Sequence, residues 1–184
     1  MARSDRMFFV SCITVLLGYL AGVVAVSLLG GDASLVTSYL AAEPRTDWLS
    51  AFGSGPAFVL GIVCCGLFLF GWLAALPLAF YKAYGLGYTA GLFLSALGTA
   101  GYLPLALCLF PSALGVCLLM AVALRDALPL SYDLFRGWLC KKERPLPDLK
   151  SYLLRSLTLF QCSSFLLLWD LFLAPLLLTS LQNR

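Results

Sequence analysis

The sequence contains no histidine, and only 11% of its 184 residues are charged. The absence of histidine excludes histidine-based acid–base catalysis, histidine-ligated haem and most zinc sites. Twelve basic residues against nine acidic ones give a net charge of +3, which is too small to indicate nucleic-acid binding. Soluble domains average about 25% charged residues, so the shortage of charge also argues against a soluble globular protein.

Hydrophobic residues are abundant instead, at 61% of the chain with a mean hydropathy of +0.95. They exceed what a chain this short can bury, so we expect lipid to be their solvent. A transmembrane helix needs about 20 apolar residues. The sequence predicts an all-α fold, a polytopic membrane helical bundle that forms one integral membrane domain, 1–184, with about five transmembrane helices. The predicted spans are 7–29, 56–80, 83–102, 103–124 and 156–181, with an outer loop at 30–55 and a basic cytoplasmic stretch at 125–155.

Basic residues indicate the orientation of the predicted spans, because cytoplasmic segments are enriched in them. With the N-terminus in the cytoplasm and the C-terminus outside, ten of the twelve basic residues are cytoplasmic, Lys82 among them, and only Arg45 and Arg184 lie outside. Arg3 and Arg6 before the first span also resemble the start of a signal peptide. The apolar segment that follows them, 7–29, is longer than the about 7–15 residues of a cleavable signal peptide. We therefore expect a retained span, with cleavage as the alternative.

The basic stretch contains apolar residues at helical spacing, namely Leu130, Leu134 and Trp138. This spacing is typical of a short helix that lies in the membrane interface. A solvated connection between two spans is equally compatible with it.

Small residues at intervals of four are the main packing signal. They lie at Ala83, Gly87, Gly91 and Ser95 in one span, and at Gly18 and Gly22 in another. Such faces let two helix backbones approach closely in lipid. We expect packing within the chain, and a contact face for a partner protein is the alternative. Pro77 and Pro111 fall inside predicted spans, where each frees a backbone carbonyl (of Leu73 and of Leu107).

Asp170 is the one ionisable residue that we expect at membrane depth, where insertion of a carboxylate costs about 2.5–3.5 kcal/mol. Ser156 and Ser163 share its predicted helix face. A neutral carboxyl that fixes helix packing, a contact to a partner's helix and a proton relay all stay open. Because no nucleophile–base pair or metal-ligand cluster is apparent, we expect no catalytic, cofactor-binding or metal-binding residues and no enzymatic activity.

One segment carries a recognisable pattern, with a second proline seven residues after Leu103-Pro104, at Pro111. It begins with the run Lys82-Ala83-Tyr84-Gly85-Leu86-Gly87-Tyr88-Thr89-Ala90-Gly91-Leu92-Phe93. This arrangement resembles the stage II sporulation protein M family, in which a glycine-spaced span precedes a helix that opens with Leu-Pro. The resemblance covers the whole chain in layout and about residues 82–124 in motif. It carries over Gly87, Gly91, Pro104 and Pro111 as structural positions.

The resemblance implies a non-enzymatic membrane scaffold that recruits and positions septal peptidoglycan hydrolases during engulfment in endospore formation. The implied partners are the lipid bilayer and the hydrolases, stage II sporulation proteins D and P, and a homo-oligomer stays open. The implied location is the cell membrane, at the sporulation septum and the mother-cell engulfing membrane. The alternative is a small membrane transport component, such as a vitamin-binding subunit or permease partner. The candidate residues for helix packing or partner contact are Gly87, Gly91, Pro104, Pro111 and Asp170.

Overall fold

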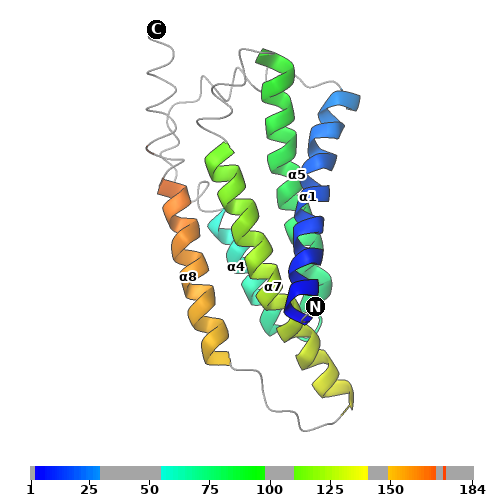
Figure 1. The fold of residues 1–184 in the computed structure, drawn as a ribbon, viewed down its shortest axis with the longest axis vertical. Helices are drawn as coiled ribbons and strands as arrows, with labels where there is room; N and C mark the ends of the chain where they lie inside the picture. The colour runs from blue at the N-terminus through cyan, green and yellow to red at the C-terminus, as the bar shows by residue number, and fades with distance from the viewer. Residues whose placement is uncertain (1–2, 30–54, 98–109, 141–148, 169–171, 173–184) are drawn as a thin grey trace.

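The computed structural model describes residues 3–29, 55–97, 110–140, 149–168 and 172. This part of the chain is all-α, as expected, and contains five helices. They are α1 (Arg3–Leu29), α4 (Pro56–Leu67), α5 (Gly71–Leu97), α7 (Phe110–Cys140) and α8 (Leu149–Leu168). Successive helices run in opposite directions along the bundle, so α1 begins at one end and α8 ends toward the other (Figure 1). Most of the predicted outer loop, residues 30–54, lies outside the described residues.

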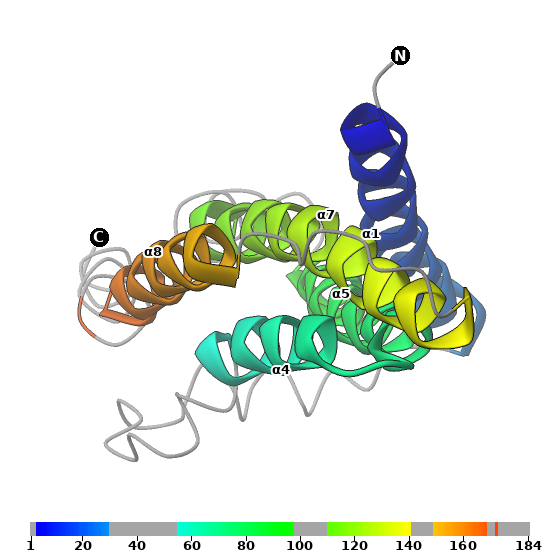
Figure 2. The same ribbon diagram turned by 90° about the horizontal axis from the view of Figure 1, so that it is seen from below.

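The core lies where α4, α5 and α7 meet. Seen along the bundle, α1 and α8 lie at opposite sides, with the other three helices between them (Figure 2). The fully buried hydrophobic side chains come from the three inner helices: Val59 and Ile62 of α4, Ala79 and Ala83 of α5, and Met120 and Leu124 of α7. Small side chains on α5 against large ones on α4 and α7 let the inner helices interlock closely.

The boundary between the second and third helices differs from the prediction. The predicted spans 56–80 and 83–102 are replaced by a 12-residue α4 and a 27-residue α5, and Lys82 lies near the middle of α5 rather than between helices. The chain instead reverses at residues 68–70, where Gly71 N–H donates to Phe68 O at 3.1 Å. A Cβ on Gly71 would collide with the Cys65 carbonyl, so glycine permits this tight turn. Lysine is a good helix former, which is why one charge does not end the helix.

The predicted cytoplasmic stretch 125–155 is also largely helical. α7 continues without interruption from Phe110 to Cys140, with Pro129 inside it, and α8 begins at Leu149 rather than at 156. Leu130 is buried against Val63 and Tyr152. The segment 130–139 is therefore part of α7, and the prediction of a separate short helix there was wrong. Trp138 and Leu139 at the end of α7 are exposed, which is compatible with the alternative of a solvated helix–loop.

Two helical segments are long and apolar enough to cross a membrane, judged by length and composition among the described residues. They are Arg6–Leu28 in α1 and Pro111–Leu139 in α7. α4 is also apolar but shorter, at 12 residues. At 1.5 Å per residue it extends about 18 Å, which is less than the about 30 Å of a bilayer core.

Candidate functional site

The small-residue faces of α1 and α5 pack against each other. A Cβ on Gly87 would collide with the backbone carbonyl of Tyr19, and a Cβ on Gly22 would lie 2.6 Å from Tyr88 N. A Cβ on Gly91 would come within 3.2 Å of the Val26 side chain. The backbones of α1 and α5 are thus in close contact at Gly22 and Gly87, as expected for small-residue faces that pack within the chain. The glycine face that could have received a partner protein is covered by α1.

The other predicted residues are less informative. Pro104 and Asp170 lie outside the described residues, as does Leu107, whose carbonyl Pro111 is predicted to free. Pro111 is the second residue of α7, and its side chain is exposed. The two serines predicted to share a face with Asp170 are both buried in α8, and each hydroxyl donates to a carbonyl of its own helix: Ser156 Oγ to Tyr152 O at 2.8 Å, and Ser163 Oγ to Phe160 O at 2.8 Å.

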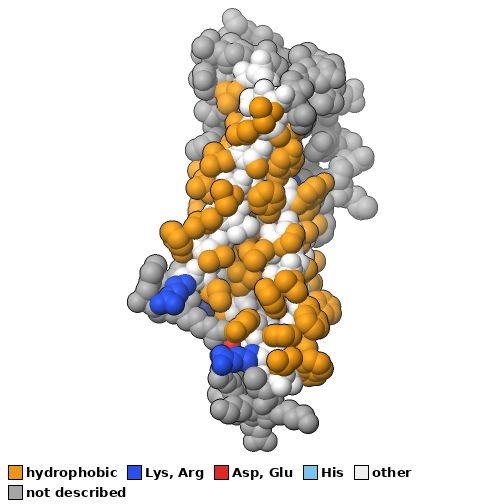
Figure 3. All heavy atoms as spheres, turned by 90° about the vertical axis from the view of Figure 1, so that its right-hand side faces the viewer, with side chains coloured by type: hydrophobic (Ala, Val, Ile, Leu, Met, Phe, Trp, Pro, Cys, Tyr) orange, Lys and Arg blue, Asp and Glu red, His pale blue; other side chains and the backbone are white. Residues whose placement is uncertain are grey.

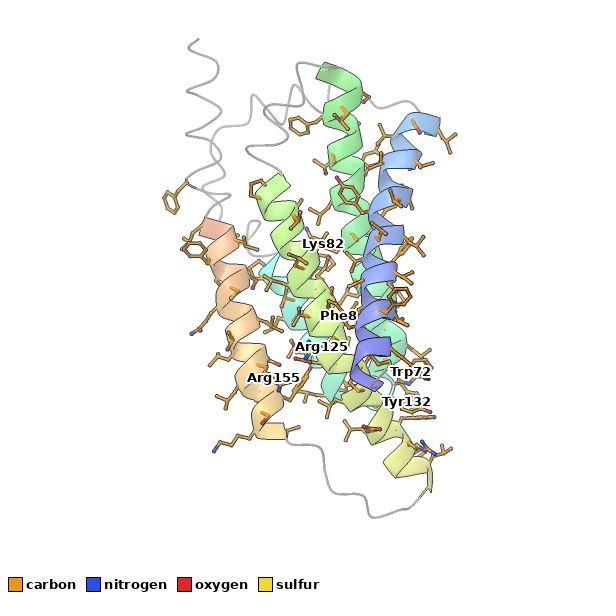
Figure 4. All side chains as sticks on the ribbon, viewed as in Figure 1. Phe8, Trp72, Lys82, Arg125, Tyr132 and Arg155 are labelled. Atoms are coloured by element: carbon orange, nitrogen blue, oxygen red, sulfur yellow. The ribbon has the colours of Figure 1, made fainter. Side chains whose placement is uncertain are left out.

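Lys82 occupies a half-buried position midway along α5 (Figure 4). Its ammonium lies 5.2 Å from the centroid of the Phe58 ring, and that ring stacks on Tyr81 at 6.4 Å between centroids. A cation over an aromatic face is attracted by the ring quadrupole, and the attraction grows where water is excluded. The contact with Phe58 therefore offsets part of the cost of placing a charge inside the bundle.

A group of three charged residues joins α7 to α8. The Asp126 carboxylate, whose side chain is 14% exposed, lies 3.5 Å from Arg125 Nε and 4.0 Å from Arg155 Nη1. Figure 4 shows the two arginines in the region where α7 and α8 face each other. The group carries a net positive charge, and the guanidinium of Arg155 is its most exposed member, with 65% of the side chain accessible.

Ser131 of α7 holds the turn between α4 and α5. Its hydroxyl donates to Phe68 O at 2.7 Å and accepts from Trp72 N–H at 2.9 Å. These backbone groups lie at the end of one helix and the start of the next, where no helical partner exists. The serine itself is 1% exposed. One hydroxyl on α7 thus satisfies two backbone groups of a neighbouring hairpin.

Tyr152 makes a similar contact from α8. Its hydroxyl donates to Val63 O of α4 at 2.7 Å, and the ring is buried. Gly66, one turn further along α4, leaves the space that the tyrosine hydroxyl occupies. Ser131 and Tyr152 together attach the α4 backbone and the turn that follows it to α7 and α8.

The outer side of the α7–α8 seam is an open groove with a volume of about 500 Å³. Its lining is almost wholly apolar and comprises Gly115, Leu118 and Leu119 of α7 and Gln161, Cys162, Phe165 and Leu166 of α8. At Gly115 the Leu166 side chain packs directly on the α7 backbone, because a Cβ at this position would lie 2.6 Å from Leu166 Cδ1. We name this open groove the α7–α8 groove.

Among the residues that the structure describes, no three His, Cys, Asp or Glu side chains come together in a way that could hold a metal ion. Comparisons of the chain with protein-family models, with curated proteins and with solved structures gave no match. The contacts of Ser131, Tyr152 and Asp126 were not predicted from the sequence. Gly66 and Gly71 flank Leu67-Phe68-Leu69-Phe70 and could have indicated a turn between them. Ser131 binds this turn, and Tyr152 binds the helix just before it.

Proposed function

We propose that this chain is an integral membrane protein and that it serves as a non-enzymatic scaffold for septal peptidoglycan hydrolases during engulfment in endospore formation. The observation that carries the membrane placement is the apolar outer surface of the bundle. Large hydrophobic side chains are exposed on all five helices, and they cover most of the face shown in Figure 3. Soluble monomers rarely expose contiguous apolar patches larger than a few hundred Å².

α1 illustrates this property most clearly. Only 28% of the most apolar part of this helix is buried, although the helix packs closely on α5 through Gly18 and Gly22. The core helix of a soluble protein would be mostly buried, whereas a lipid-facing helix needs to bury only its packing face. The close fit against α5 supports a retained first span, because removal of α1 would expose the glycine face of α5.

Basic residues support the proposed orientation. α1 begins, α7 ends and α8 begins at the same end of the bundle (Figure 1), and this end carries Arg6, Arg136 and Lys150. The bias of basic residues toward the cytoplasm makes this the inner end. Lys82 no longer counts toward the bias, because it lies within α5. The proposed arrangement is five passes through the membrane, in which the 12-residue α4 spans only part of the bilayer core, with the N-terminus inside and the C-terminus outside.

Fusions to the two ends of the chain test this orientation. A fluorescent protein that matures only in the cytoplasm is expected to fluoresce at the N-terminus and to stay dark at the C-terminus. Alkaline phosphatase, which folds only outside the cytoplasm, should show the opposite pattern. The same reporter active at both ends would contradict five crossings.

The role in sporulation is supported by the sequence resemblance over residues 82–124. Within this segment Gly87 and Gly91 pack inside the bundle. Hydrolase contact, under this proposal, uses other surfaces of the chain. Catalysis belongs to the hydrolases, and the bundle supplies a fixed position in the membrane.

Co-purification tests the scaffold role directly. A tagged chain, solubilised in mild detergent from sporulating cells, is expected to bring the two hydrolases with it, and its deletion should arrest engulfment and disperse the hydrolases from the septum. Normal engulfment in a deletion strain that holds no second copy would contradict the proposal. A bound small molecule without hydrolases would instead favour the transport alternative.

A further inference from the structure

The α7–α8 groove lies along a seam whose register is regular. Gly115 faces Leu166 at one part of the seam, and Asp126 faces Arg155 eleven residues further along α7 and eleven residues back along α8. Antiparallel helices in this register stay in contact along about 16 Å, at 1.5 Å per residue. The apolar groove and the charged group therefore lie along the same pair of helices, with Gly115 and Asp126 about 16 Å apart along α7.

The two ends of this seam differ sharply in chemistry. The groove presents apolar side chains and almost no polar surface, with Leu118 and Phe165 among those exposed. The other end presents Arg155 and, at the first turn of α8, the exposed Lys150. The negative charge of Asp126 offsets one of the two positive charges of Arg125 and Arg155, so the group keeps a net positive charge. An occupant that matches both ends is apolar along its length and anionic at its head.

We propose that the α7–α8 groove binds one acyl chain of an anionic phospholipid and that Arg155 binds the phosphate of its headgroup. Asp126 is the positioning residue, because its carboxylate lies 4.0 Å from Arg155 Nη1. The lipid comes from the leaflet at the end of the bundle where α8 begins. A peptide helix fits less well, because the charge lies at one end of the groove only. The proposal rests on the membrane placement above and is independent of the role in sporulation.

Lipid titration of the purified protein, followed by native mass spectrometry, tests the proposal. Phosphatidylglycerol is expected to bind in preference to phosphatidylcholine of the same chain length. One basic residue near a membrane surface contributes about 1 kcal/mol to binding of anionic lipid, so Arg155→Gln should weaken phosphatidylglycerol binding about fivefold. Arg136→Gln is the matched control, because this exposed arginine of α7 lies away from the groove. It should leave binding unchanged.

A second variant tests the apolar end. Cys162→Trp places a large side chain in the groove and is expected to reduce the binding of both lipids, while Arg155→Gln affects only the anionic one. Equal binding of the two lipids, or equal effects of Arg155→Gln and Arg136→Gln, would overturn the proposal and leave the membrane placement intact. A protein that is extracted from membranes by alkaline carbonate without detergent would overturn both.

Discussion

Replacement of Gly87 by leucine is expected to abolish stable packing of α1 on α5. The Cβ alone would collide with the backbone carbonyl of Tyr19, which cannot rotate away as a side chain can. Overpacking of a tight interface typically costs about 1–3 kcal/mol, and a clash with backbone should reach or exceed the upper end of that range. The helices would have to separate along the whole seam that includes Gly22.

Gly85 supplies the matched control for this substitution. It lies two residues away on the same helix and is exposed, and a Cβ added to it would have no neighbouring atom within 4 Å. Gly85→Leu should therefore match the wild-type melting temperature in detergent, while Gly87→Leu lowers it by at least several degrees. Similar melting temperatures for the two variants would show that α1 and α5 do not pack as described.

Replacement of Ser131 by alanine is expected to destabilise the turn between α4 and α5. The change removes the acceptor of Trp72 N–H and one of the two donors to Phe68 O, which keeps its bond from Gly71 N–H. A buried polar group that loses its partner costs about 1–3 kcal/mol, so the loss at Trp72 N–H should lower the free energy of unfolding by about that amount. Hydrogen exchange at the Trp72 amide should accelerate, because its acceptor is gone.

Ser27→Ala is the control for the loss of a hydroxyl. This exposed serine bonds to the carbonyl of Val24 in its own helix, at 2.7 Å. Its replacement should change the melting temperature by less than about a degree, since surface substitutions are usually within about 0.5 kcal/mol. Equal effects of the two substitutions would contradict a specific role of Ser131.

The small-residue faces of α1 and α5 can be predicted from the sequence because they depend on local spacing, whereas the pairing of these two helices comes from the structure. Gly18 and Gly22 on one helix and Gly87 and Gly91 on the other recur every four residues, and that period alone places them on a face. The helix boundaries are harder to predict. The cost of a charge in lipid predicts a helix end at Lys82, whereas the Phe58 ring accommodates this lysine within α5.

The contacts of Ser131 and Tyr152, and that of Asp126 with Arg155, could not be predicted from the sequence, because each joins residues that local spacing does not relate. Ser131 meets Phe68, and Tyr152 meets Val63, across 63 and 89 positions respectively. Nothing local to a serine or a tyrosine indicates which distant carbonyl it will reach. Only the packing of α7 and α8 on α4 determines these pairs.

The length of α7 has a mechanical consequence. At 1.5 Å per residue its 31 residues extend about 46 Å, well beyond a hydrocarbon core of about 30 Å. Ser131, which binds the α4–α5 turn, lies in the last ten residues of α7. The exposed Trp138 and Leu139 form the tip of the same helix. The exposed tip and the α4–α5 turn are thus joined through one continuous helix, so a displacement of the tip along the helix axis should also displace the turn that Ser131 binds.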